Sequence, residues 1–326
     1  MKNFKKAFTM MELIFVIVIM GILAKFGVEF LTTAYSGFIN STINNQLQQN
    51  SAAALEFVGA RLQYRIKAST IAREPSIGPN ANEATPINLY FGLNNNAPTA
   101  NILEWIGYDI EGYRGGTTGT WSGVLDLNLT RTNATQLFSL ATNTTDIGTL
   151  VNALSYGSSD MNSTAIYFIN PDGIVEDNIT KFGWDMNLNL AARKDVFDNQ
   201  DNVYIHPIDS GATPSIFSPI DADGNPNNFT NVLASEFYQL AWTAYAVGIK
   251  TPFHPDGDNN LTLWYDYQPW QGEVYTDGKE VTIMQHVSSF QFIARESIIK
   301  IQVCVKSLLL IQEGEEYSIC KEKTIF

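Results

Sequence analysis

The chain has few of the side chains from which active sites and metal centres are built. Its 326 residues include two cysteines and three histidines. The histidines, His206, His254 and His286, are scattered and lack metal-ligand spacing. The sequence also has no phosphate-binding loop, nucleophile elbow or dinucleotide fingerprint. We therefore expect that the protein is not an enzyme.

Basic side chains are also scarce. Lysine and arginine together number 20 against 33 acidic residues, which gives a formal net charge of -13. A surface this acidic disfavours broad contact with nucleic acid or anionic lipid. The charge balance predicts no nucleic-acid partner for the bulk of the chain.

No proline precedes Pro75, and the chain opens with a basic leader followed by a long apolar run. Lysines occupy positions 2, 5 and 6, and from Phe8 to Ala24 the only polar side chains are Thr9 and Glu12. Seventeen helical residues span roughly 25 Å, near the lower limit for a membrane helix. The positive flank predicts a cytoplasmic N-terminus and an exported C-terminal part.

A secretory signal peptide would end in a small-residue cleavage site. Here Gly21 to Ala24 runs directly into Lys25, which is a poor site of that kind. Glu12 is more telling, because a carboxylate inside a membrane segment costs about 2.5 to 3.5 kcal/mol and marks a functional position by default. The alternative is a tolerated carboxylate near the cytoplasmic edge of the membrane.

The run from Lys5 to Ile14, KKAFTMMELI, resembles the N-terminal segment of type IV prepilins and type II secretion pseudopilins. The resemblance implies cleavage between Ala7 and Phe8 by a prepilin peptidase and N-methylation of Phe8. Glu12 then becomes the fifth mature residue and Gly21 keeps its expected place, both with roles in assembly. Two departures are Ala7, where the family usually has Gly, and Glu29, where major pilins carry a proline.

By this resemblance the chain is a minor pseudopilin or minor pilin of a type II secretion system or type IV pilus, similar to the large J or W type. It implies an inner-membrane protein with its head in the periplasm. The implied partners are other pilins or pseudopilins, the inner-membrane platform protein and, through it, the assembly ATPase. Two alternatives remain: a pseudopilin of a DNA-uptake system, and an adhesin or binding module held by an uncleaved signal anchor.

Beyond the membrane segment, apolar residues recur at three- and four-residue steps, which predicts a continued amphipathic helix. We expect one helix from about Thr9 to Ile71; the alternative is two helices broken near Tyr35–Gly37. The chain then divides into a leader (1–7), an assembly half of the helix (8–39), an amphipathic half (40–72) and a β-rich head (73–326). The expected fold class is α+β and pilin-like, with an antiparallel sheet packed on the helix.

The head's clearest strands are expected near its end. Leu261, Leu263, Tyr265 and Tyr267 share one face of a strand, as do the odd positions from Ile299 to Val305. A third run, Val281–Phe292, lies between them, and a short strand is expected at Asn88–Leu93. Together the three later runs predict an antiparallel meander with one buried face.

Cys304 and Cys320 are the only cysteines. In an oxidising periplasm they can pair, and closing a loop of this size contributes ~3 kcal/mol. A C-terminal disulfide loop also resembles the one found in many type IV pilins.

Two acidic loops gather oxygen ligands at alternating positions, as calcium prefers. They contain Asp221, Asp223 and Asn225, and Asp256 and Asp258. Neither is an EF-hand, so a structural calcium and a pair of solvated Asx-turns both remain open.

Finally, four Asn-x-Thr triplets carry an acidic residue two positions before the asparagine. The pattern is similar to the extended acceptor sequence of bacterial N-glycosylation, and it occurs at Asn128, Asn162, Asn178 and Asn260. In a chain rich in asparagine and threonine, such matches also arise by chance, so both interpretations remain open.

Overall fold

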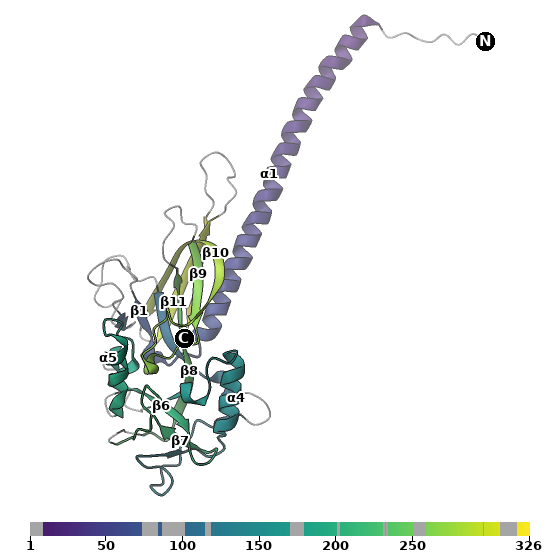
Figure 1. Cartoon of the computed structure of the whole chain (residues 1–326). Helices are drawn as coiled ribbons and strands as arrows, with labels where there is room; N and C mark the ends of the chain where they lie inside the picture. Colours follow the sequence, from purple (N-terminus) through teal and green to yellow (C-terminus); the bar gives the residue numbers. More distant parts are fainter. Residues whose placement is uncertain are drawn as a thin grey trace, which may run out of the picture.

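The computed structural model describes residues 9–73, 84–86, 102–114, 119–169, 179–200, 203–230, 232, 234–250, 259–295, 297–306 and 318–326. It consists of one long N-terminal helix that projects from a β-rich head (Figure 1). The fold class is α+β, as the sequence predicts. The expected strand at Asn88–Leu93 lies outside the described residues.

The N-terminal helix, α1, runs unbroken from Met10 to Leu62. The alternative of two helices separated near Tyr35–Gly37 is therefore wrong. The predicted end near Ile71 is also wrong, because the chain leaves the helix nine residues earlier to join the sheet. Arg65 donates from Nη1 to the carbonyl of Leu62 at 2.8 Å, so a buried guanidinium satisfies one of the helix's final carbonyls.

Twelve strands among the described residues form one connected sheet. Its main path runs β12-β11-β10-β9-β8-β5-β6-β7-β4, and β3, which pairs with β8, carries β1 and β2 on its far side. All pairings are antiparallel. The strands are β1 (Ile71–Arg73), β2 (Ala84–Pro86), β3 (Ile102–Tyr108), β4 (Leu137–Phe138), β5 (Ala165–Phe168), β6 (Ile205–Ser210), β7 (Ile216–Pro219), β8 (Tyr238–Ile249), β9 (Asn259–Tyr265), β10 (Lys279–Arg295), β11 (Ile298–Lys306) and β12 (Ser318–Ile325).

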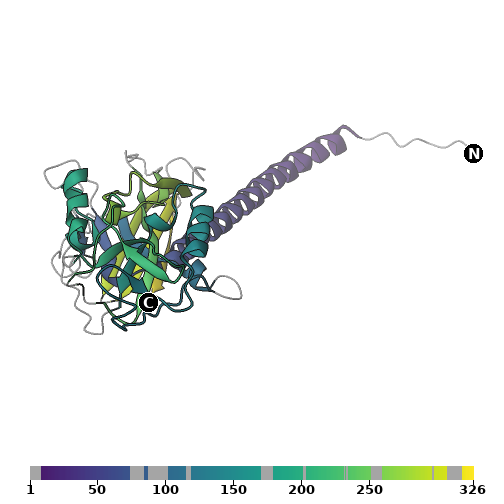
Figure 2. The ribbon, with the colours of Figure 1, turned by 60° about the horizontal axis from the view of Figure 1, so that its bottom comes forward.

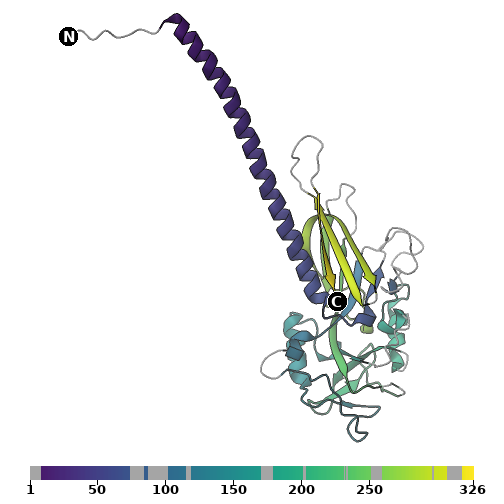
Figure 3. The same ribbon diagram turned by 180° about the vertical axis from the view of Figure 1, so that it is seen from behind.

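Strand β8 links two parts of the head. Its C-terminal residues pair with β9, while its first residues, Tyr238 to Ala241, pair with β5. We call the part that contains β1–β3 and β9–β12 the proximal lobe, and the part that contains β4–β7 the distal lobe. The view from behind places α1 against the proximal lobe, with the distal lobe beyond the end of the helix (Figure 3). The view with the bottom turned forward shows α1 projecting from one side of the head (Figure 2).

The second half of α1 packs on one face of the proximal lobe. Ala54, Leu55, Val58 and Leu62 are buried against the sheet, which confirms the predicted stripe over this part of the helix. Opposite them lie the odd-numbered residues of β11 from Ile299 to Val305, as predicted. Fully burying one such aliphatic side chain contributes about 1.5 to 3 kcal/mol.

The meander of β9, β10 and β11 is also confirmed, with one correction at Tyr267. Leu261, Leu263 and Tyr265 face the helix, but Tyr267 belongs to the core on the other face, together with Trp264. The reason is Asp266, whose φ of 60° is left-handed and breaks the alternation of the strand. The alternation predicted for these odd-numbered residues therefore ends with Tyr265, the last residue of β9.

The distal lobe has its own core and a helix that we did not expect from the sequence. Its apolar cluster contains Trp121, Phe217 and Tyr238, together with Ile147 and Val151 of α4 (Thr144–Leu154). Asn143 caps α4 by accepting hydrogen bonds from the backbone N–H groups of the first turn. Two shorter helices complete the described part of the head: α3 (Ile110–Arg114) and α5 (Leu190–Asp195).

Candidate functional site: the projecting half of the N-terminal helix

The first half of α1 has no packing partner within the described chain. Every residue from Met10 to Phe38 is exposed, and eighteen of these positions carry large apolar side chains. We call Met10–Phe38 the projecting half of α1. The helix is long and apolar enough to cross a membrane, by length and composition alone. A soluble monomer rarely exposes an apolar surface this large, so lipid or another protein must cover it.

Glu12 lies in the first turn of α1. Thr9 is the N-cap, and its hydroxyl accepts a hydrogen bond from the Glu12 backbone N–H at 3.4 Å. A carboxylate in the first turn interacts favourably with the positive end of the helix dipole. The helix therefore begins just beyond the predicted cleavage point, while Ala7 and Phe8 themselves lie outside the described residues.

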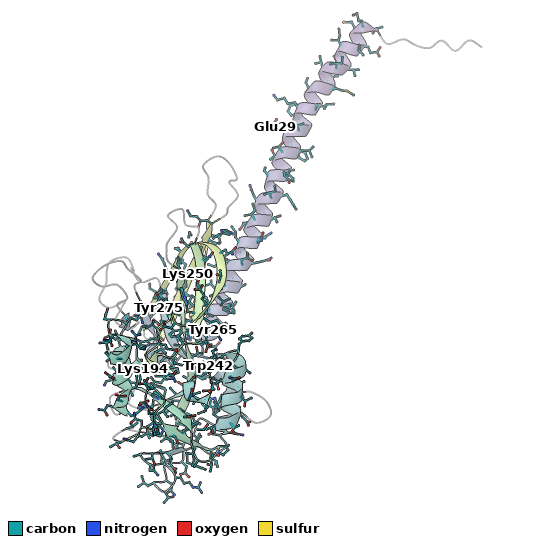
Figure 4. All side chains as sticks on the ribbon, in the orientation of Figure 1. Glu29, Lys194, Trp242, Lys250, Tyr265 and Tyr275 are labelled. Atoms are coloured by element: carbon teal, nitrogen blue, oxygen red, sulfur yellow. A yellow bond between two sulfur atoms is a disulfide. The ribbon has the colours of Figure 1, made fainter. Side chains whose placement is uncertain are left out.

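Gly21 lies in the middle of the projecting half. A Cβ built on it would meet nothing within 4 Å, so no neighbour within the described chain requires a glycine there. Its predicted role in assembly therefore stays a prediction. One turn further on, Lys25 and Glu29 are four residues apart on the same helix, and Glu29 extends from the part of α1 that is clear of the head (Figure 4).

A groove of about 770 Å³ lies where α1 first meets the sheet. One wall is α1, with Gln46, Asn50 and the half-exposed Phe57. The other is the start of β10, from Val281 to His286, where register shifts interrupt the pairing with β9. Its lining combines apolar side chains with side-chain amides. No local pattern in the sequence could predict this groove, because its two walls are more than 200 residues apart.

The disulfide between Cys304 and Cys320 is present, which confirms the predicted pair. The two residues are directly opposite each other on β11 and β12, with their Cα atoms 4.0 Å apart. They lie on the face of the sheet that points away from α1, because the alternate residues of β11 are those buried against the helix. The bond ties the C-terminal edge strand to the sheet.

The loop of Asp221, Asp223 and Asn225 is closed by its own hydrogen bonds. Oδ1 of Asp221 accepts from the backbone N–H groups of Asp223 and Asn225 at 2.9 and 2.8 Å, and its Oδ2 accepts from the Asn225 amide at 3.0 Å. Asp223 pairs with Lys194 at 2.5 Å. This is an Asx-turn with a lysine partner, and in this geometry the donor set does not fit a calcium ion.

The other predicted calcium ligands, Asp256 and Asp258, lie outside the described residues. Within the described residues no group of three or more histidine, cysteine or acidic side chains is arranged so that it could hold a metal ion. The calcium interpretation stays a prediction.

A buried ion pair lies on the face of the sheet opposite α1. Arg73 donates from Nε to Glu104 at 2.7 Å, and both side chains are 1% exposed. The Tyr267 hydroxyl donates to the other carboxylate oxygen at 2.9 Å, and Arg73 also donates to the Trp184 carbonyl at 3.2 Å. Burial, followed by the negative charge of Glu104, holds the pKa of Tyr267 well above its usual range. The group is a structural tie between β1, β3 and the chain after β9.

A second polar cluster joins the two lobes. Asp266 accepts hydrogen bonds from Ser158 and Ser159, which follow α4, and pairs with Lys279 of β10 at 2.7 Å. Burial alone would raise the pKa of Asp266, but these hydrogen bonds and the lysine charge outweigh it and lower the pKa. The cluster couples the end of α4 to the proximal lobe.

Two other buried titratable groups have shifted pKa values. Asp109 follows β3 and accepts hydrogen bonds from the Gly112 backbone at 3.0 Å and the Trp121 ring at 3.1 Å, yet burial raises its pKa to about 6. His206 contacts Gln200 at 2.9 Å, and burial lowers its pKa to about 3. Both lie in packed surroundings and act as parts of the head's core. His286 has a φ of 60° in the irregular part of β10, and His254 lies outside the described residues.

Comparison of the chain with protein-family models, curated proteins and solved structures finds no match in any of the three. Function is therefore argued from the residues and the geometry above.

Proposed function

We propose that the chain is a minor pilin or pseudopilin subunit that assembles through the projecting half of α1. In this proposal a prepilin peptidase cuts between Ala7 and Phe8, and the helix first lies in the inner membrane with the head on the periplasmic side. The helix then enters a bundle of related subunits, driven by the platform protein and the ATPase of a type II secretion or type IV pilus machine.

The length of the exposed segment carries the proposal. Met10–Phe38, which is largely apolar but contains Lys25 and Glu29, spans roughly 43 Å at ~1.5 Å per residue. The hydrocarbon core of a bilayer is about 30 Å thick, so even a helix tilted by about 40° would leave several ångströms of exposed helix outside it. A simple membrane tether has no use for this excess. Lateral packing against neighbouring helices covers it.

The position of Glu12 supports the same conclusion. After cleavage the mature chain would begin at Phe8, so a terminal ammonium would stand four residues before the Glu12 carboxylate in the sequence. Buried charges of this kind are tolerated when they are paired, and a pair sets geometry more than it adds stability. A charge pair between adjacent subunits would fix the axial step from one helix to the next.

The size of the head supports a minor or tip role. A head of about 250 residues with two lobes is larger than bundled helices at ~10 Å spacing can repeat along a fibre without crowding. The distal lobe lies beyond the end of α1, where a terminal subunit has free space (Figure 1).

The test compares Glu12→Gln with Glu29→Gln in a strain that carries the machine. Both variants remove one carboxylate from the projecting half of α1. We expect both to be inserted and cleaved to a Phe8 terminus, as read by mass spectrometry, and only Glu12→Gln to be lost from purified assemblies. Full incorporation of Glu12→Gln at normal protein levels would overturn the assigned role of Glu12.

The N-terminus itself supplies an independent test. An intact Met1 on the membrane-bound protein, in cells with active peptidase, would point to an uncleaved signal anchor and refute the proposal. A methylated Phe8 terminus would support it, since an anchored binding module has no need of that modification.

A further inference from the structure

Acidic residues are concentrated before the asparagines of the Asn-x-Ser/Thr triplets. The sequence holds eight such triplets without proline in the middle, at Asn40, Asn128, Asn133, Asn143, Asn162, Asn178, Asn228 and Asn260. Four of the eight have an acidic residue two positions earlier. With 33 acidic residues in 326, chance placement predicts about one. The excess singles out Asn128, Asn162, Asn178 and Asn260.

These four triplets differ in how exposed they are in the folded head. At Asn162 and Asn260 the threonine that an acceptor site requires is buried: Thr164 is 0% exposed and Thr262 is 2% exposed. A transferase that acts on the folded head has no access to these two side chains. Asn178 lies outside the described residues. At Asn128 the asparagine and Thr130 are both exposed, and Asp126 is half-buried at the surface.

The Asn128 side chain is held with its reactive atom outward. Its Oδ1 accepts hydrogen bonds from the backbone N–H and the hydroxyl of Thr130, at 3.0 and 2.9 Å. Asp126 Oδ1 accepts from the Asn128 backbone N–H at 3.0 Å, which fixes the acidic residue beside the turn. Among the described residues, the amide nitrogen Nδ2 of Asn128 has no hydrogen-bond partner.

Two exposed leucines flank this turn. Leu127 and Leu129, on either side of Asn128, are 47% and 84% exposed. They border a groove of about 550 Å³ whose far wall includes Phe229 and Val232. A bulky, soluble group attached at Asn128 would cover both leucines.

We propose that Asn128 is an acceptor for N-linked glycosylation of the exported head. Nδ2 of Asn128 forms a bond to the anomeric carbon of an oligosaccharide that a polyprenyl diphosphate carries. The bond from that carbon to the diphosphate oxygen breaks, the lipid diphosphate leaves, and one amide proton passes to a base of the oligosaccharyltransferase. The inference rests on export of the head, which is part of the proposed function, and is independent of how the helix assembles.

The chain contains a matched control five residues downstream. Asn133 is exposed and forms the same turn, with its Oδ1 accepting from the backbone N–H and the hydroxyl of Thr135, both at 2.9 Å. Arg131 stands two positions before it, where Asp126 stands before Asn128. The two sites therefore differ mainly in the sign of one charge.

The experiment produces the full chain in bacteria that carry an oligosaccharyltransferase selective for the acidic position and its lipid-linked oligosaccharide. Peptide mass spectrometry then maps the glycans. We expect glycan on Asn128 and none on Asn133, Asn162 or Asn260. Asn128→Gln and Asp126→Ala should abolish the Asn128 glycan, while Arg131→Asp should create a new one on Asn133. Equal modification of Asn133 in the unaltered chain would overturn the assignment, as would glycan on Asn162 or Asn260 with Asn128 bare.

The state of the Cys304–Cys320 pair in the same peptide map reports export. An oxidised Cys304–Cys320 disulfide together with an Asn128 that carries no glycan overturns this inference and leaves the proposed function standing. A reduced pair with a bare Asn128 means that the head stayed in the cytoplasm, which contradicts both.

Discussion

Replacing Glu104 with alanine should strongly destabilise the head. Glu104 lies in β3 beneath the sheet, and its carboxylate accepts from Arg73 at 2.7 Å and from the Tyr267 hydroxyl at 2.9 Å. Removing it leaves a buried guanidinium without its carboxylate and a buried hydroxyl without its acceptor. Both losses act on side chains that water does not reach.

The expected magnitude follows from that burial. Removing one partner of a buried ion pair destabilises by about 3 to 5 kcal/mol. For a protein with a head of this size, each 1 kcal/mol shifts the midpoint by about 2 to 4 °C, so Tm should fall by roughly 6 to 20 °C. In Glu104→Gln the amide oxygen still accepts from one of the two donors. The Tm of this variant should therefore lie between that of Glu104→Ala and that of the unaltered protein.

The matched control is the exposed pair of Arg131 and Asp126, whose side chains are 55% and 35% exposed. Asp126→Ala should cost less than about 1 kcal/mol, because water screens this pair.

The assay is thermal unfolding of the full chain in detergent, followed by tryptophan fluorescence, to which the nearby Trp184 contributes. Adding Arg73→Met to Glu104→Ala should recover part of the loss, because it removes the orphaned charge. If Glu104→Ala melts within 1 or 2 °C of the Asp126→Ala protein, the ion pair does not stabilise the head and the reasoning fails.

Three further outcomes are expected. Under non-reducing conditions, Cys304→Ser should lower the free energy of unfolding by about 3 kcal/mol relative to the unaltered protein, as read by urea denaturation. Under reducing conditions the unaltered protein also lacks the disulfide, so the difference should vanish. Burial raises the folded-state pKa of Asp109 to about 6, so the contribution of this group to stability is full below about pH 4 and is lost as the pH rises through about 6. Asp109→Asn should therefore flatten this part of the profile of Tm against pH. An unchanged profile would contradict the pKa shift. A chain truncated to begin near Asn40 should be a folded monomer by light scattering, and its spontaneous growth into long homopolymers would count against the minor role.

The sequence was sufficient for features that depend on local pattern. The absence of proline before Pro75 and the stripe through Leu55, Val58 and Leu62 predicted one long helix that packs on a sheet. The alternation in β11 predicted its buried face. Helix α4 also has a local signal in its Asn143 cap, which our interpretation of the head as β-rich overlooked.

Other features depend on contacts that no local pattern shows. Helix α1 ends at Leu62 because the next residues bond to β3: the Ile66 N–H donates to the Ile106 carbonyl at 2.8 Å. Tyr267 changes face because Asp266 takes a left-handed conformation, and its N–H bonds to the Thr243 hydroxyl at 2.8 Å. In each case the hydrogen-bond partner is at least 23 residues away in the sequence. Local propensity therefore could not predict where the helix ends or which face of the sheet Tyr267 occupies.

The proposed assembly and the proposed modification would use different parts of the chain. The helix is anchored through Leu55, Val58 and Leu62 to the proximal lobe, and the apolar core of the distal lobe contains no residue of α1. Asn128 belongs to the distal lobe, where the neighbouring Asp126 N–H donates to the Phe138 carbonyl of β4 at 2.9 Å. A group attached at Asn128 would therefore lie away from the proximal lobe, on which the helix packs. It would also leave free the groove between α1 and β10.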